Sequence, residues 1–109
     1  MSKWTQLRLL FRAFACRDLE ALHDIAAHYA SSYEDGLLPR KYYDRAFRYY
    51  EYGAMKGNPA CQYDYGFMLI LGSAGVQDKE RGVFWIKKSA EAGDLAAKDF
   101  FADYPQSEE

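Results

Sequence analysis

Histidine and cysteine could supply a metal site or a catalytic nucleophile and base, and the chain has two of each. His23 and His28 are five residues apart, so they do not share a helix face as an i,i+4 metal-binding pair does. A zinc site built from Cys16, one histidine and Cys61 would join distant residues and would be short of ligands. We therefore predict no metal site and two reduced thiols, which fits a cytoplasmic protein.

A nucleophilic serine or cysteine needs a histidine and an orienting acid beside it, and no motif brings such a set together. Asp24 next to His23 is typical of a pair on a helix surface. Gly72 and Gly75 precede a helix as in a phosphate loop, but no Gly-Lys-Ser/Thr follows, and Asp78 would repel an anion. We predict that the chain is not an enzyme, has no catalytic residues and binds no cofactor.

Length, composition and charge restrict the class of protein. With 109 residues, 50% of them apolar, the chain is long enough for one domain with a core. A net charge of −2 argues against a nucleic-acid partner. No stretch approaches the ~18 apolar residues of a membrane span. Ala13–Cys16 is similar to a lipoprotein cleavage site, but Arg8 and Arg12 interrupt the segment before it. We expect no membrane partner.

Helical periodicity dominates the sequence, and no segment alternates apolar and polar residues as a half-buried strand does. Six helices are predicted. The first has an apolar face made of Trp4, Leu7, Leu10, Phe11 and Phe14. The others begin near Asp18, Arg40, Pro59, Asp78 and Asp94, and Gly57, Gly72 and Gly93 end three of the helices. This order predicts an all-α fold of antiparallel helical hairpins.

The sequence also repeats itself at an offset of 36 residues. The aligned pairs are Ala46 with Gly82, Tyr49 with Trp85, Tyr50 with Ile86, Ala54 with Ala90, Gly57 with Gly93, Asn58 with Asp94 and Ala60 with Ala96. One such unit cannot bury its apolar face alone, so we predict stacked units. Trp85 is expected to fill the space between two helices, whereas Ala54, Gly66 and Ala90 are expected to let helix backbones approach closely.

Residues 60–96 resemble the Sel1-like repeat, a helix-turn-helix relative of the tetratricopeptide repeat. The matching positions are Ala60, Tyr65 and Gly66 in the first helix, Gly72, Gly75, Val76 and Asp78 in the loop, and Trp85, Ser89, Ala90 and Gly93 in the second helix. The resemblance implies a short right-handed superhelix, or solenoid, of helical hairpins. It also implies a role in binding other proteins.

We predict one domain with five parts: an N-terminal capping helix (1–17), a divergent first repeat (18–57), a second repeat (58–93), a C-terminal capping helix (94–104, with Phe100, Phe101 and Tyr104) and an acidic tail (105–109). In the first repeat, Ile25, Ala26 and Tyr29 resemble the family signature. Tyr29 and Ala46 are 17 residues apart, against 13 between Leu69 and Gly82, so the first hairpin connection is predicted to be about one turn longer.

Nine of the ten tyrosines lie between Tyr29 and Tyr65. Adjacent helical positions point ~100° apart, so the runs at 42–43 and 49–52 cannot all face inward. The repeat alignment assigns Tyr49 and Tyr50 to packing. Exposed tyrosine and arginine are typical of binding hot spots, and we predict partner-binding residues at Tyr33, Arg40, Tyr42, Arg45, Arg48 and Tyr52. The alternative is that these tyrosines only cover a thin solenoid.

Charge is unevenly distributed, with +4 over residues 1–17, +3 over 40–56 and −5 over 89–109. Solvated faces or a basic patch for an acidic partner would account for this pattern. The predicted function is non-enzymatic protein binding. By analogy with free-standing small repeat proteins, it is a bacterial immunity or inhibitor protein that neutralises a toxin or effector. Alternatives are an adaptor, scaffold or chaperone subunit of a larger complex, and a regulatory homodimer.

Overall fold

The computed structural model describes residues 1–103, and this range contains six α-helices and no strand. The helices are α1 (Lys3–Phe14), α2 (Leu19–Glu34), α3 (Arg40–Met55), α4 (Pro59–Leu71), α5 (Lys79–Glu91) and α6 (Leu95–Asp103). The all-α prediction is confirmed. Tyr104 and the predicted acidic tail at 105–109 lie outside the described residues.

Side-chain caps begin four of the helices at the predicted places. The carboxylate of Asp18 accepts hydrogen bonds from the backbone N–H groups of Glu20 and Ala21. The side chains of Asn58, Asp78 and Asp94 each accept one from the backbone N–H three residues further on. Each cap satisfies a backbone donor that has no partner inside its helix, which fixes where the helix starts.

The turns that lead into α4 and α6 share one geometry. The residue before each cap has positive φ, 98° at Gly57 and 101° at Gly93, and the backbone N–H of the cap donates to the carbonyl oxygen five residues before it. The turn that leads into α2 is different, because Arg17 has φ of 56° and the N–H of Asp18 donates to the carbonyl oxygen of Arg12, six residues before it. Arg17 is the one non-glycine residue with positive φ in the described range.

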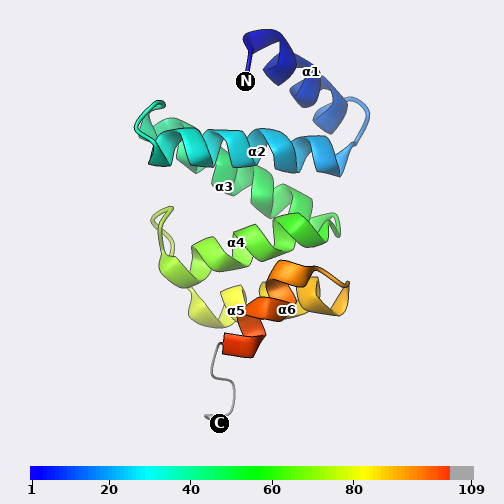
Figure 1. Cartoon of the computed structure of the whole chain (residues 1–109), viewed down its shortest axis with the longest axis vertical. Coiled ribbons are helices and arrows are strands. Elements are labelled where there is room, and N and C mark those ends of the chain that lie inside the picture. Colours follow the sequence, from blue (N-terminus) through cyan, green and yellow to red (C-terminus); the bar gives the residue numbers. More distant parts are fainter. Residues whose placement is uncertain (104–109) are drawn as a thin grey trace.

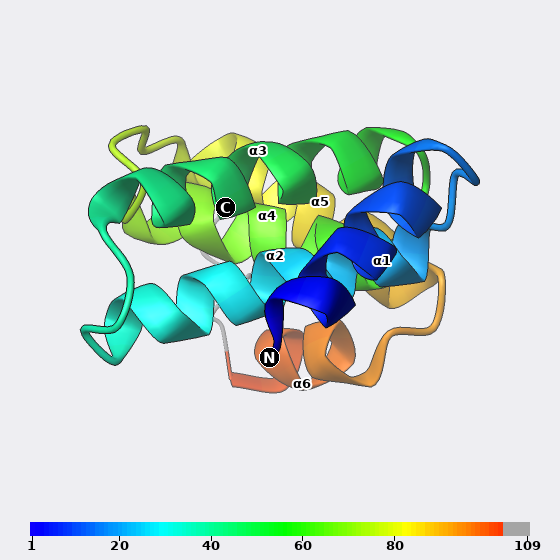
Figure 2. The ribbon, with the colours of Figure 1, turned by 90° about the horizontal axis from the view of Figure 1, so that it is seen from above.

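The helices stack along the long axis of a molecule that measures 48 × 28 × 19 Å. In Figure 1, α1 lies at the top end and α6 at the bottom. The hairpin of α2 and α3 packs on the hairpin of α4 and α5 through contacts between α3 and α4. Figure 2 shows that α3 and α5 lie towards the rear, α2 and α6 lie forward, and α4 is set back between them. This arrangement is a short helical solenoid.

One continuous core runs through both hairpins. Its fully or nearly fully buried members include Ile25 and Tyr29 from α2, Tyr50 from α3, and Tyr65 and Leu69 from α4. Aromatic rings occupy much of it, since the first repeat places tyrosines where smaller residues would leave gaps. A smaller cluster of Ala13, Ala21 and Leu22 joins α1 to α2.

The second repeat is packed through two glycines. A Cβ atom added at Gly66 would lie 2.5 Å from the carbonyl oxygen of Gly82, and one added at Gly82 would lie 2.5 Å from the carbonyl oxygen of Gly66. Only hydrogen fits at either position, so α4 and α5 approach to backbone contact. The predicted role of Gly66 is confirmed, and Gly82 shares it.

Three expectations about the packing need correction. The first hairpin connection is not longer: it covers residues 35–39, against 72–78 in the second hairpin. The additional residues lie in the helices, which have 16 residues each in the first repeat and 13 each in the second. Sequence separation counts helix and loop together, so it could not assign the extra turn.

The second correction concerns the side chain that fills the second hairpin. Ile86 is 0% exposed and lies at the centre, whereas Trp85 is half-buried at the edge of the core. The Trp85 ring contacts Tyr65 at 5.9 Å and Phe84 at 5.3 Å between centroids. Because adjacent residues of a helix point in directions ~100° apart, Ile86 faces the interior and Trp85 faces its edge.

The third correction concerns the N-terminal end. Of the predicted apolar face of α1, Leu10 packs on the core, together with Leu9. Trp4, Leu7 and Phe11 are exposed, and Phe14 is partly exposed with its ring against Tyr49 and Tyr52 of α3. Cys16, which follows this helix, is exposed as well, whereas Cys61 is buried.

Candidate functional site

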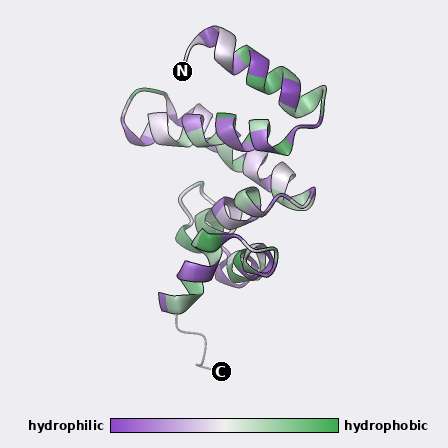
Figure 3. Cartoon of the chain, turned by 45° about the vertical axis from the view of Figure 1, so that its right-hand side comes forward, coloured by the Kyte–Doolittle hydropathy of each residue, from purple (hydrophilic) through white to green (hydrophobic). Residues whose placement is uncertain are grey.

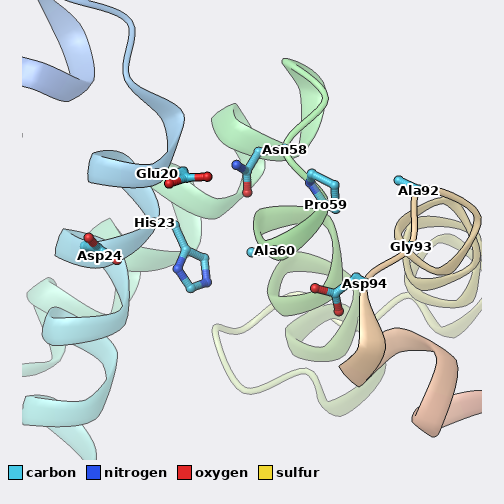
Figure 4. A pocket seen from close by; sticks show the side chains of 9 residues that line it. All are labelled: Glu20, His23, Asp24, Asn58, Pro59, Ala60, Ala92, Gly93 and Asp94. Atoms are coloured by element: carbon cyan, nitrogen blue, oxygen red, sulfur yellow. The ribbon is translucent and has the colours of Figure 1, made fainter.

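A hollow of about 410 Å³ opens on the front of the solenoid, between α2 and the turn that joins α5 to α6. Figure 4 shows Glu20, His23 and Asp24 of α2 on one side, Asp94 opposite them, and the start of α4 between. The start of α4 forms the floor because that helix is set back between α2 and α6. The remaining lining residues are Asn58, Pro59, Ala60, Ala92 and Gly93.

His23 is held by an acid from the neighbouring repeat. Its Nε2 lies 2.6 Å from Oδ2 of Asp64 on α4, and both side chains are partly exposed. The hydrogen bond to Asp64 outweighs desolvation and raises the pKa of His23 above its ordinary value. The hydrogen-bond partner of His23 is therefore Asp64 on α4 and not its neighbour Asp24, which lies exposed on the wall of the hollow.

A second hollow of about 270 Å³ continues along α2 and α4 on the other side of this ion pair. His23 lines the first hollow and Asp64 lines the second. Apolar side chains from α4, Phe67, Met68 and Leu71, form much of the second hollow, and Glu34 borders it at the end of α2. We refer to the two hollows together as the front groove.

The front groove is acidic. Its carboxylates are Glu20, Asp24, Glu34, Asp64 and Asp94, and no lysine or arginine is among its lining residues in the described range. Asp64 is paired with His23 and the side chain of Asp94 caps α6, whereas Glu20, Asp24 and Glu34 make no ion pair within residues 1–103. A groove with acidic borders and an apolar floor suits a ligand that is basic and apolar.

The chemistry of the remaining titratable groups is limited. Burial raises the pKa of the Cys61 thiol to about 12, so this cysteine is a packing residue rather than a nucleophile. Within residues 1–103 no three His, Cys, Asp or Glu side chains are grouped to hold a metal ion. None of the helices in this range combines the length and apolar character needed to cross a membrane.

The predicted partner-binding residues of α3 are spread over more than one face. Arg40 joins the start of α3 to the loop between α4 and α5, because its guanidinium donates to Asp44 Oδ1 at 3.0 Å and to the carbonyl oxygen of Ser73 at 2.9 Å. It also lies over the rings of Tyr33 and Tyr43. Tyr33 is half-buried against Tyr43 rather than on the surface.

The other four predicted residues form two pairs. Tyr42 is half-buried, with its ring 5.1 Å from that of Tyr29, and the Arg45 guanidinium covers its outer side. Arg48 and Tyr52 lie together at the far end of α3, where they line a shallow hollow. Tyr52 is 40% exposed, and of the three tyrosines assigned to the surface it is the one that the structure exposes.

The residues that match the repeat signature take structural roles in the turns, caps and helix contacts. Gly72, Gly75 and Gly93 have positive φ, and Asp78 caps α5. Ala54 is buried, Ala90 is half-buried, and Ala60 lines the front groove.

Sequence reasoning missed the front groove, although one signal was available. Aligning the caps Asp18 and Asn58 pairs Asp24 with Asp64 at an offset of 40 residues. Two acids at one position of successive front helices indicate a shared acidic face. The 36-residue alignment began at Ala46 and therefore compared the rear helices α3 and α5.

The fold and the groove define a class of protein, the helical repeat proteins in which paired helices stack to leave a binding surface along one side. The family model named Sel1 repeat matches residues 20–58 and 59–94, and the chain therefore belongs to the Sel1 repeat family. The chain matched none of the curated proteins and none of the solved structures with which it was compared. Sel1 repeats generally mediate protein–protein interaction and are generally not enzymes.

Proposed function

We propose that this chain is a non-enzymatic, cytoplasmic protein that binds a partner protein in the front groove and neutralises it, as an immunity protein neutralises a toxin or effector. The observation that carries the proposal is the groove itself. It is open, acidic at its borders and apolar at its floor, and it lies across both repeats of a family that generally mediates protein–protein interaction.

The groove favours a segment of a protein over a small molecule. Its two hollows lie in line along α2 and are shallow, so they suit successive side chains of one extended or helical segment. The free carboxylates of Asp24 and Glu34 favour lysine or arginine in that segment. An enzyme whose active-site face is basic would be blocked by such a contact.

The test is co-expression with an enzyme encoded beside this chain, followed by co-purification and an assay of that enzyme. We expect a complex and loss of the enzyme's activity. Asp24→Lys should weaken the complex and restore the activity. Glu80→Lys, on α5 outside the groove, makes the same change in charge and should do neither. Equal effects of the two variants would overturn the groove as the binding site.

The same experiment separates the alternatives. An adaptor, scaffold or chaperone subunit would form a complex that leaves the partner active. A regulatory homodimer would show a mass that levels off at twice that of the monomer and would need no other protein. Binding through the Arg48 and Tyr52 end of α3 would respond to Tyr52→Ala and not to Asp24→Lys.

A further inference from the structure

The strongest feature left unexplained is a ridge of large apolar side chains on α1. Trp4 is 78% exposed and Phe11 64%, and Leu7 lies beside them. Phe14, at the end of the ridge, is less exposed because its ring contacts Tyr49 and Tyr52 of α3. Small proteins rarely expose so many large apolar residues together unless another molecule covers them. In Figure 3, α1 carries hydrophobic and hydrophilic segments side by side at the end of the molecule. We refer to Trp4, Leu7, Phe11 and Phe14 as the α1 ridge.

The solenoid does not require the two most exposed residues of this ridge. When the N-caps Asp18, Asn58 and Asp94 are aligned, Trp4 and Phe11 correspond to Asp44 and Glu51 in α3 and to Glu80 and Lys87 in α5. Those positions carry charged side chains in both repeats. Two large apolar residues at positions where the repeats have charges indicate a contact specific to α1.

The ridge is bordered by positive charge. At ~100° per residue, Lys3 and Arg8 flank the ridge on its two sides. Neither makes an ion pair within residues 1–103, whereas Arg12 is bound to Asp18. Residues 1–17 contain no acid. Two ridges facing each other would therefore bring like charges together, which disfavours a symmetric pair of α1 helices.

The front groove has the complementary chemistry. Its free carboxylates Asp24 and Glu34 are ten residues apart on α2, and the ridge from Trp4 to Phe14 also covers ten residues. At 1.5 Å per residue both lengths are ~15 Å. Between those carboxylates lie the two hollows, which could receive aromatic side chains. A basic, apolar helix is the kind of ligand that such a groove suits.

The ridge and the groove of one molecule lie in different places. The ridge belongs to the helix at the top end of the molecule, whereas the groove crosses α2, α4 and the start of α6 on the front. A second copy is therefore needed to bring them together. We propose that the α1 ridge of one copy docks in the front groove of another, so that the chain self-associates head to tail in the absence of its partner.

This inference rests on the proposed function, since it uses the same groove, and it adds a regulatory consequence. A partner that enters the groove must displace the α1 helix of a neighbouring copy. Because the contact joins two different surfaces, it can extend beyond a dimer, and the mean mass should rise steadily with concentration. Because both surfaces are charged, added salt should weaken it.

The test is a charge exchange followed by sedimentation equilibrium. The ridge variant Lys3→Glu/Arg8→Glu and the groove variant Asp24→Lys/Glu34→Lys should each raise the dissociation constant about ten-fold or more, since each places like charges across the contact. Mixing the two variants should restore association, because each then meets the opposite charge. Circular dichroism should confirm that both variants are folded. Failure of the mixture to associate would overturn the proposal.

A second measurement uses Trp4 as a reporter. In a Trp85→Phe background Trp4 is the remaining tryptophan. Its emission should shift to shorter wavelength as the concentration rises, and should not shift in the groove variant. A monomer at all concentrations, whether or not Trp4 responds to anionic vesicles, would overturn self-association. If that monomer still binds its partner, the proposed function stands. If the chain self-associates but binds no partner, the inference of self-association stands and the proposed function fails.

Discussion

The two repeats build the same hairpin in different ways. In the second repeat, Gly66 and Gly82 bring the backbones of α4 and α5 into contact. In the first, the corresponding residues are Ala26 and Ala46, and both are fully buried. Their methyl groups hold α2 and α3 further from backbone contact, and tyrosine rings fill the added space. The comparison shows that the same helical hairpin can be packed either through close backbone contact or through aromatic side chains.

The two repeats also differ in what they contribute to the molecule. The glycine-packed repeat leaves little room for substitution at its centre. The first repeat carries most of the tyrosines and contributes Glu20, Asp24 and Glu34 to the groove. The second therefore acts as a support, and the first supplies most of the groove's free carboxylates.

The largest effect on stability should come from exchanging glycine and alanine at the corresponding positions of the two repeats. Gly66→Ala should lower the free energy of unfolding by about 3 kcal/mol, because the added methyl meets the Gly82 carbonyl oxygen and neither backbone can move alone. Ala26→Gly in the first repeat should cost only about 1 kcal/mol, the usual effect of glycine within a helix. Urea denaturation measures both. Similar costs would show that the two hairpins do not differ in this way.

The next comparison is within the second repeat. Ile86→Ala should cost about 3 kcal/mol, since the side chain is fully buried. Trp85→Ala should cost about half as much, because that ring is partly solvated at the edge of the core. Thermal and urea unfolding of the two variants would decide the order. A larger loss for Trp85 would restore it as the central residue of the hairpin.

The tyrosines of the first repeat give the third comparison. Tyr42→Ala should cost about 1–2 kcal/mol, because its ring packs edge-on against Tyr29. Tyr52→Ala should cost about 0.5 kcal/mol or less, since this ring is more exposed. Tyr42→Phe is the matched control and should be close to neutral, because it keeps the ring. Equal losses for the two alanine variants would contradict the different burial of their rings.

The smallest effect concerns the ion pair that joins the repeats. The raised pKa of His23 means that the folded state favours the charged imidazole. The contribution of the pair is therefore complete below pH 6.5, the ordinary pKa of histidine, and is lost as the pH rises through the raised value. It should amount to less than about 1 kcal/mol, because both side chains are partly exposed.

Comparing wild type with His23→Gln between pH 5 and 9 would measure this contribution, with Asp64→Asn as a second variant. The wild-type advantage should shrink as the pH rises. An advantage that grows with pH would mean that Asp64 does not stabilise the charged form of His23.

Much of the fold could be predicted because its determinants are local. Asp18, Asn58 and Asp78 cap helices through atoms within three residues of themselves, and Gly57 and Gly93 end helices by their own φ. The repeat alignment then supplies the stacking. Orientation about a helix axis is less local: Trp85 and Ile86 are both apolar, and only the packed neighbours decide which one faces inward.

The site was harder to predict, for a physical reason. The acids of the front groove are ordinary surface residues in sequence, and they form a site only because α4 is set back between α2 and α6. The face of α1 shows the same limit. The spacing of Trp4, Leu7 and Phe11 predicts that they share one side of a helix, but it does not tell whether anything covers that side.

The turns at Gly57 and Gly93 bear on how such a chain can change in length. Both deliver the chain into the next helix with the same backbone geometry, since φ is 98° and 101° and the same backbone hydrogen bond closes each turn. The segment between these two turns therefore begins and ends with the same backbone geometry and can be inserted as one unit. We expect that duplicating residues 58–93 after Gly93 would lengthen the array by one hairpin and extend the acidic surface, without redesign of either flank.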